Sequence, residues 1–169
     1  TIFGFAKHYE TGEALPEDIF QKLKDQKNFG VGMMSCRQIL FGLLDMELHS
    51  NFDAETESIF DVHRRIASKC TPYSLPLSED RFLCTFSHIF AGGYSAGYYS
   101  YKWAEVMSAD AFGAFEDVGL ENEEKVREVG RKFRDTVLSL GGGVEPMAVF
   151  KQFRDREPSP EALLRHNGL

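Results

Sequence analysis

Apolar residues recur every three or four positions through most of this 169-residue chain, and no segment shows the strict alternation of a β-strand. The clearest case lies between residues 29 and 51, where one helical stripe contains Phe29, Met33, Cys36, Leu40, Leu43 and Leu48. The sequence therefore predicts an all-α fold. The spacing predicts helices over about 16–27, 29–51, 54–69, 94–116, 122–139, 145–154 and 159–166.

Glycine and proline interrupt this helical pattern at defined places. The segment 71–80 contains two prolines and has no helical period, which predicts a loop. Gly92 and Gly93 form a second break, and Gly141 begins a run of three glycines that ends the helix over 122–139. In the last helix, Ser159 is expected as the N-cap, with proline at the next position. We expect one multi-helix lobe with a glycine-rich loop, formed by residues 1–169 as a single segment.

Composition excludes several classes of function. With 43% apolar and 27% charged residues the chain is typical of a globular protein. Its net charge of −7 argues against a nucleic-acid partner. No apolar run approaches the ~20 residues that span a membrane. Three cysteines without CxxC spacing are typical of a reducing compartment. The basic residues of 127–134 alternate with acidic ones, which indicates a solvated helix face.

The segment from His88 to Glu105 is the candidate site. If residues 94–105 are helical, Tyr94, Tyr98 and Tyr101 fall within about 60° of one another on one face. Trp103 and Val106 are then expected to point toward the core. Phenols keep their protons at neutral pH, so a row of them can donate to peptide carbonyls or to a developing oxyanion. The glycine pair lets the backbone approach a ligand, and His88 can add another donor.

Other interpretations of this segment stay open. The tyrosines could instead pack at a seam between helices. A phosphate loop lacks the flanking GxGxxG or GxxxxGK[ST] pattern. Cys84 and His88 are four residues apart, but no second ligand pair follows, and no partner of Cys84 for nucleophilic catalysis can be identified. His49 and His63 are expected to be solvated or capping residues. None of the five histidines begins an HExxH motif, so no metal site is predicted within the chain.

These residues resemble a known family. Residues 86–110, with the run HIFAGGYSAGYYSYKW, resemble the glycine-rich loop and tyrosine helix of the thimet oligopeptidase and oligopeptidase A family of zinc metallopeptidases. Residues 8–16 are similar to the helix and turn downstream of the family's zinc site, residues 37–49 to its next long helix, and the segment from 140 to its C-terminus. The resemblance covers essentially the whole chain, and plant and bacterial members of the oligopeptidase A branch are the most similar.

The resemblance implies the C-terminal portion of a larger helical zinc peptidase that hydrolyses short peptides. In that family zinc is held by HExxH and a later Glu, which would lie upstream of this chain, and the first residue, Thr1, suggests a processed or truncated piece. Residues 1–169 are then expected to be inactive alone. Their partners would be short peptides and the missing upstream part of the protein. Residues 1–169 are expected to expose apolar patches where that upstream part packs against them. The compartment would be the cytoplasm or an organellar lumen, such as the chloroplast stroma or mitochondrial matrix.

The resemblance also implies roles for individual residues, which are assigned by their positions in the family's motif. His88, Gly92, Gly93, Tyr94 and Tyr98 would contact the substrate. The catalytic set would be Tyr101, Tyr98 and His88, with Tyr101 donating to the oxyanion beside zinc and Tyr98 as the second candidate for that donor. The alternative function is a non-catalytic helical module that binds a peptide in a groove floored by the same tyrosines.

Overall fold

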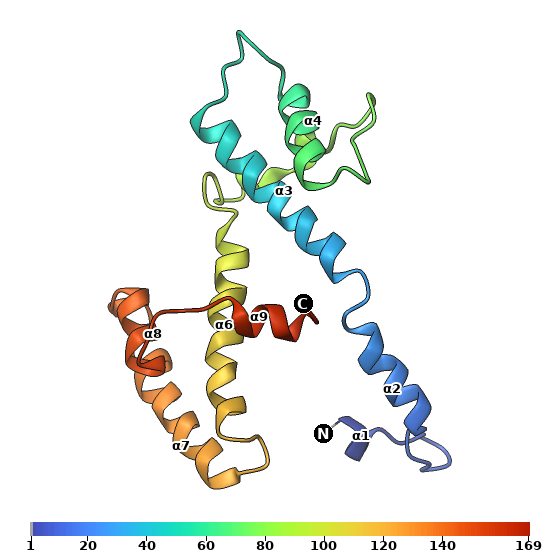
Figure 1. Cartoon of the computed structure of the whole chain (residues 1–169), viewed down its shortest axis with the longest axis vertical. Coiled ribbons are helices and arrows are strands. Elements are labelled where there is room, and N and C mark those ends of the chain that lie inside the picture. Colours follow the sequence, from blue (N-terminus) through green and yellow to red (C-terminus); the bar gives the residue numbers. More distant parts are fainter. Residues whose placement is uncertain (1) are drawn as a thin grey trace.

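The computed structural model describes residues 2–169, and it is helical, as predicted (Figure 1). Within these residues, one isolated β-bridge joins Lys7 to Ala14. The elements in chain order are α1 (Ile2–Phe5), α2 (Glu17–Gln26), α3 (Val31–Ser50), α4 (Ile59–Cys70), α5 (Phe82–Thr85), η1 (Ser87–Ile89), α6 (Ser100–Asp117), α7 (Glu123–Phe133), η2 (Arg134–Leu138, a π-helical turn), η3 (Gly141–Gly143), α8 (Pro146–Arg154) and α9 (Glu161–His166).

The chain first climbs and then descends (Figure 1). Helices α2 and α3 follow each other up one side, and α4 packs against the upper part of α3. The chain then passes through α5, η1 and the glycine-rich loop into α6, which runs down the molecule. Helices α7 and α8 lie beside α6, and α9 crosses it. Gly168, near the C-terminus, lies against the side chain of Asn28 between α2 and α3.

The upper core lies between α3, α4, α5 and η1. Its buried residues are Leu40, Phe41, Leu44, Val62, Ile66, Ala67, Leu83, Phe86, Ile89 and Tyr98. The predicted apolar stripe of α3 is partly wrong, because Leu43 and Met33 are exposed while Phe41 and Leu44 are buried. Helix α3 is apolar on nearly every side, so periodicity alone does not select the face against which α4 packs.

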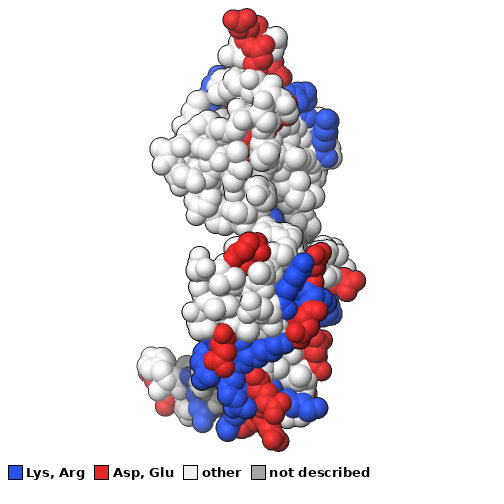
Figure 2. Space-filling view, turned by 90° about the vertical axis from the view of Figure 1, so that its left-hand side faces the viewer, with Lys and Arg blue, Asp and Glu red and all other residues white. Residues whose placement is uncertain are grey.

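The lower core lies between α6, α8 and α9. It buries Ala109, Ala114, Val149, Phe150, Phe153 and Ala162. Phe133 at the end of α7 packs edge-on against Phe153, with ring centroids 5.3 Å apart. The outer faces of α7 and α8 are charged: Arg127 pairs with Glu123 at 3.2 Å. Figure 2 shows basic and acidic residues interspersed over this lower half, whereas in the upper half of the same face the charges lie at the tip and the edges.

Two helix starts outside the candidate site differ from the prediction. The helix expected over 54–69 begins at Ile59, because Ser58 and Asp61 form a capping box in which each side chain accepts from the other residue's backbone N–H. The last helix begins at Glu161, whose N–H reaches the Ser159 hydroxyl at 3.3 Å. His63, expected to be solvated, is instead buried in the upper core with 6% of its surface exposed.

Large apolar side chains are exposed along α2 and the segment that joins it to α3. Within the described residues, α2 buries none of its side chains, and Ile19 and Leu23 face solvent. Phe29, between α2 and α3, is 88% exposed. This agrees with the expected exposed apolar patches. No helix in the described part of the chain is long and apolar enough to cross a bilayer.

Candidate functional site

The glycine-rich loop turns back tightly on η1. The backbone N–H of Gly92 donates to Ser87 O at 2.8 Å, and that of Tyr94 donates to His88 O at 3.0 Å. A Cβ at position 92 would lie 2.7 Å from His88 Cα, so no larger residue fits without moving backbone. Gly93 has φ +81°, in the left-handed region that favours glycine. The loop geometry therefore requires both glycines.

A buried carboxylate on α3 anchors the next part of the loop. Asp45, which has no exposed surface, accepts from the backbone N–H groups of Ala96 and Tyr98 at 2.8 Å each. The ring Nδ1 of His49 lies 2.9 Å from the same carboxylate. Ala96 adopts φ +51°, which is uncommon for a residue with a Cβ. The two bonds to Asp45 stabilise that conformation and set the path of the chain into α6.

The three predicted tyrosines come together in this turn. Tyr98 is buried, packs edge-on against Phe41 and Phe86, and donates its hydroxyl proton to Gln38 Oε1 at 3.0 Å. The ring of Tyr101 stacks on Tyr94 with centroids 4.9 Å apart and lies 5.0 Å from Tyr98. Tyr101 is 39% exposed, so it is the member of the cluster that a ligand can approach from solvent.

The route by which they meet differs from the prediction. Helix α6 begins at Ser100, so Tyr94 and Tyr98 lie in the turns before it and not on one helical face. They reach Tyr101 because the chain turns between residues 94 and 100, where Ala96 has φ +51° and Asp45 accepts from the N–H groups of Ala96 and Tyr98. Trp103 is 44% exposed and does not point into the core, and Val106 is half-buried. The prediction for Trp103 and Val106 assumed a helix that starts at residue 94, and such a helix would point their side chains in other directions.

His88 completes the cluster. It is exposed, and its ring centroid lies 6.2 Å from Tyr94 and 6.1 Å from Tyr98. The structure thus brings together all the predicted site residues: His88, Gly92, Gly93, Tyr94, Tyr98 and Tyr101.

The phenols are held in their protonated form. A hydrogen bond with Tyr94, with a contribution from burial, raises the pKa of Tyr101 to about 12. Burial also raises the pKa of Tyr98 above its ordinary value of 10. Both groups therefore keep their protons at neutral pH. Tyr98 is buried and donates to Gln38, whereas Tyr101 is exposed, so Tyr101 is the better placed of the two to donate to a ligand.

Asp45 and Gln38 are the site residues that sequence reasoning did not assign. Both are polar residues within an otherwise apolar part of α3, and that pattern is the signal that could have found them. Each satisfies a group of the tyrosine segment more than fifty positions away in the chain. Their partners could not be named without the tertiary structure.

The described residues do not assemble a metal site. Within 2–169 no group of three or more His, Cys, Asp or Glu side chains lies close enough to hold an ion. Cys84 and His88 therefore have no third ligand in this part of the chain.

The described geometry is that of a helical segment with a glycine-rich loop that carries a cluster of tyrosines, and the chain can be compared with known proteins. A model of Peptidase family M3 matches residues 1–169, and the chain belongs to that family. This confirms the resemblance seen in the sequence.

Several of the similar proteins are oligopeptidases. The chain is 59% identical to organellar oligopeptidase A, chloroplastic/mitochondrial, of Arabidopsis thaliana, over 100% of this chain and 21% of that protein. It is 57% identical to the probable cytosolic oligopeptidase A of the same plant, over 100% of this chain and 24% of that protein. Oligopeptidase A of Escherichia coli is 45% identical over 96% of this chain and 23% of its own length. The chain thus spans less than a quarter of the length of these relatives.

Proposed function

We propose that residues 1–169 are the substrate-binding and oxyanion-stabilising C-terminal portion of the catalytic domain of a zinc-dependent oligopeptidase that hydrolyses short peptides. The observation that carries this proposal is the cluster of Tyr94, Tyr98 and Tyr101 on a loop anchored by Asp45. Family membership and the oligopeptidase relatives support it. The relatives' names also support a cytosolic or organellar compartment.

The residues of this chain would act by binding and orienting the substrate. His88 is exposed and Tyr94 is half-buried, and both would donate to the peptide backbone. Tyr101, with its pKa raised to about 12, stays a neutral donor and would stabilise negative charge developing on the scissile carbonyl oxygen. Tyr98 would position Tyr101 through ring contact, since its own hydroxyl is committed to Gln38.

Zinc, which the family implies, does not fit the residues described here, because no suitable group of ligands comes together. We propose that its ligands lie in another part of the same protein, upstream of this chain. Residues 1–169 alone would then bind peptides without hydrolysing them. The partners of this segment would be short peptides and that upstream part.

The test is Tyr101→Phe in the full-length protein, assayed by steady-state hydrolysis of a short peptide. We expect kcat to fall about 100-fold, the usual effect of removing one oxyanion donor, with little change in KM. Tyr99→Phe is the matched control, because Tyr99 is 58% exposed and lies next to the cluster in sequence. An unchanged kcat for Tyr101→Phe would show that this phenol does not take part in catalysis.

A further inference from the structure

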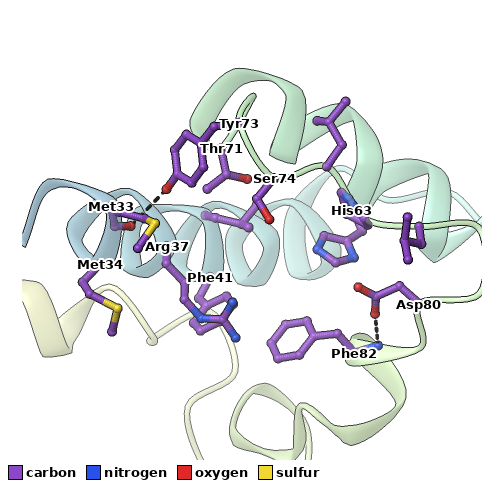
Figure 3. Close-up of a pocket in the computed structure, with 14 residues that line it drawn as sticks. Met33, Met34, Arg37, Phe41, His63, Thr71, Tyr73, Ser74, Asp80 and Phe82 are labelled. Atoms are coloured by element: carbon purple, nitrogen blue, oxygen red, sulfur yellow. Dashed lines mark hydrogen bonds between the residues drawn. The ribbon is translucent and has the colours of Figure 1, made fainter. Parts of the chain in front are cut away.

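A cavity lies on the other side of Phe41 from the tyrosine cluster. Its volume is about 840 Å³, and it is bounded by α3, α4 and the loop 71–80 (Figure 3). Tyr73 holds the loop over the cavity by donating its hydroxyl proton to Met33 O at 3.1 Å. Met33, Met34, Leu75 and Leu77 supply an apolar wall. The cavity is large enough for one or two amino-acid residues of a peptide.

Arg37 is the cation of this cavity. Its guanidinium lies 4.8 Å from the ring centroid of Phe41 and 5.9 Å from that of Phe82, and Figure 3 shows it beside Phe41 and directed toward Phe82. No described carboxylate lies within 4.0 Å of it to form an ion pair. Stacking on two rings fixes the plane of the guanidinium and leaves its N–H donors available for a carboxylate.

The other charged and titratable groups of the cavity are committed elsewhere. The Asp80 carboxylate accepts from Phe82 N at 2.7 Å, at the end of the cavity away from Arg37 (Figure 3). His63 lies near Asp80, and burial lowers the pKa of its ring, so it is neutral at neutral pH. The positive charge at the Arg37 end is therefore not offset by these neighbours.

The cavity lies next to the tyrosine site. Phe41 contacts Arg37 on one side and the ring of Tyr98 on the other, with its centroid 5.8 Å from that of Tyr98. Arg37 and Gln38 are adjacent in α3, and Gln38 accepts from Tyr98. An extended peptide advances about 3.3 Å per residue, so a few residues are enough to reach from one site to the other.

We propose that this cavity binds the C-terminal carboxylate of a peptide substrate, with Arg37 as the partner of the carboxylate and the apolar wall receiving the terminal side chain. The proposal rests on the proposed function, because it assumes that the ligand is a peptide whose backbone lies along the tyrosine cluster. It adds a reason for a preference for short substrates, since a peptide extended well past Arg37 cannot place its terminus there.

The test uses the full-length protein and one synthetic pentapeptide ending in leucine, made as the free acid and as the C-terminal amide. We expect KM for the acid to be about tenfold lower than for the amide, with similar kcat, the size expected for one charge-assisted hydrogen-bonded contact at a partly exposed site. In Arg37→Gln, KM for the acid should rise to that of the amide. Arg64→Gln is the control, because Arg64 pairs with Asp61 on α4 outside the cavity.

Binding of the same two peptides, labelled at the N-terminus and followed by fluorescence anisotropy, separates this proposal from the proposed function. If no hydrolysis occurs, the proposed function fails, and tighter binding of the acid that depends on Arg37 still supports the cavity. Equal binding of acid and amide by the unsubstituted protein overturns the cavity proposal. So does Arg37→Gln lowering the melting temperature while the acid–amide difference persists, because Arg37 then pairs with a carboxylate of the protein itself.

Discussion

The upper and lower cores each contain one fully buried aspartate, and the two are satisfied in different ways. Asp45 on α3 accepts from two backbone N–H groups of the segment 96–98, and a histidine ring lies beside it. Asp110 on α6 accepts from Arg156 at 2.6 Å and 2.5 Å, from Arg154 at 3.2 Å and from Ser159 N at 2.7 Å. One carboxylate is bound chiefly by neutral amides and the other by two cations.

This difference reflects what each aspartate holds in place. Backbone amides fix the path of the chain itself, so Asp45 determines the shape of the turn that carries Tyr98. The arginine side chains are long and join separate elements, so Asp110 ties α6 to the end of α8 and to the segment before α9. Arg154 also donates to the carboxylate of Asp117, which lies about two turns further along α6. The upper aspartate therefore shapes a site, whereas the lower one cross-links helices.

The largest expected effect is on the stability of the lower core. Asp110→Asn leaves Arg154 and Arg156 without their shared buried carboxylate, and breaking such a buried pair should lower the free energy of unfolding by about 3 kcal/mol. Chemical denaturation of the full-length protein measures this. Asp135→Asn is the control, since Asp135 pairs with Arg134 at the surface. A loss no greater than that of the control would contradict the cross-linking role.

A smaller loss of stability but a clearer loss of activity is expected from Asp45→Asn. The amide offers one acceptor oxygen for two buried N–H groups, so one of them loses its partner, at a cost of about 2 kcal/mol. Because the turn carrying Tyr98 shifts, kcat for a short peptide should also fall about tenfold. Asp110→Asn, assayed in the same way at a temperature where it is folded, should leave kcat nearly unchanged. Equal effects of the two substitutions on kcat would remove the distinction between the cores.

The smallest expected effect is a difference between the upper and lower cores in how their stability depends on pH. Burial lowers the pKa of His63 below 6.5, so acidification protonates the unfolded state first and destabilises the upper core as pH falls below about 6.5. Burial alone would raise the pKa of Asp110, but the hydrogen bonds from Arg156 and Ser159 N lower it below 3.8. Its stabilisation is present above that value and is lost only as pH falls through the lower folded pKa.

Hydrogen exchange between pH 7 and 5, corrected for intrinsic rates, measures this difference. Amides of α4 should lose protection as pH falls, while those of α8 should not. His63→Phe should abolish the change in α4, because the ring no longer titrates. Equal loss of protection in both cores would show that another group controls the acid response.

The closeness of His88, the glycine pair and the three tyrosines was predictable from the sequence, but their geometry and their partners Asp45 and Gln38 were not. The sequence places His88, the glycine pair and three tyrosines within fourteen residues, and chain connectivity alone keeps them close. The assumption of one continuous helix from residue 94 was wrong, because Ala96 has φ +51° and Asp45 accepts from the N–H of Tyr98, which a helix would have bonded to Tyr94 O. Local propensity cannot reveal a competing acceptor that comes from another helix.

By itself, the sequence determined the helical class of this protein, the positions of its glycine and proline breaks, and the residues of its loop, because periodicity, φ preferences and missing N–H groups act over a few neighbouring positions. Tertiary structure alone decided which face of α3 is buried, which acceptor holds the tyrosine turn, and that Arg37 has no ion-pair partner among residues 2–169. Those outcomes depend on contacts between segments far apart in the chain, where packing and the satisfaction of buried polar groups outweigh local preference.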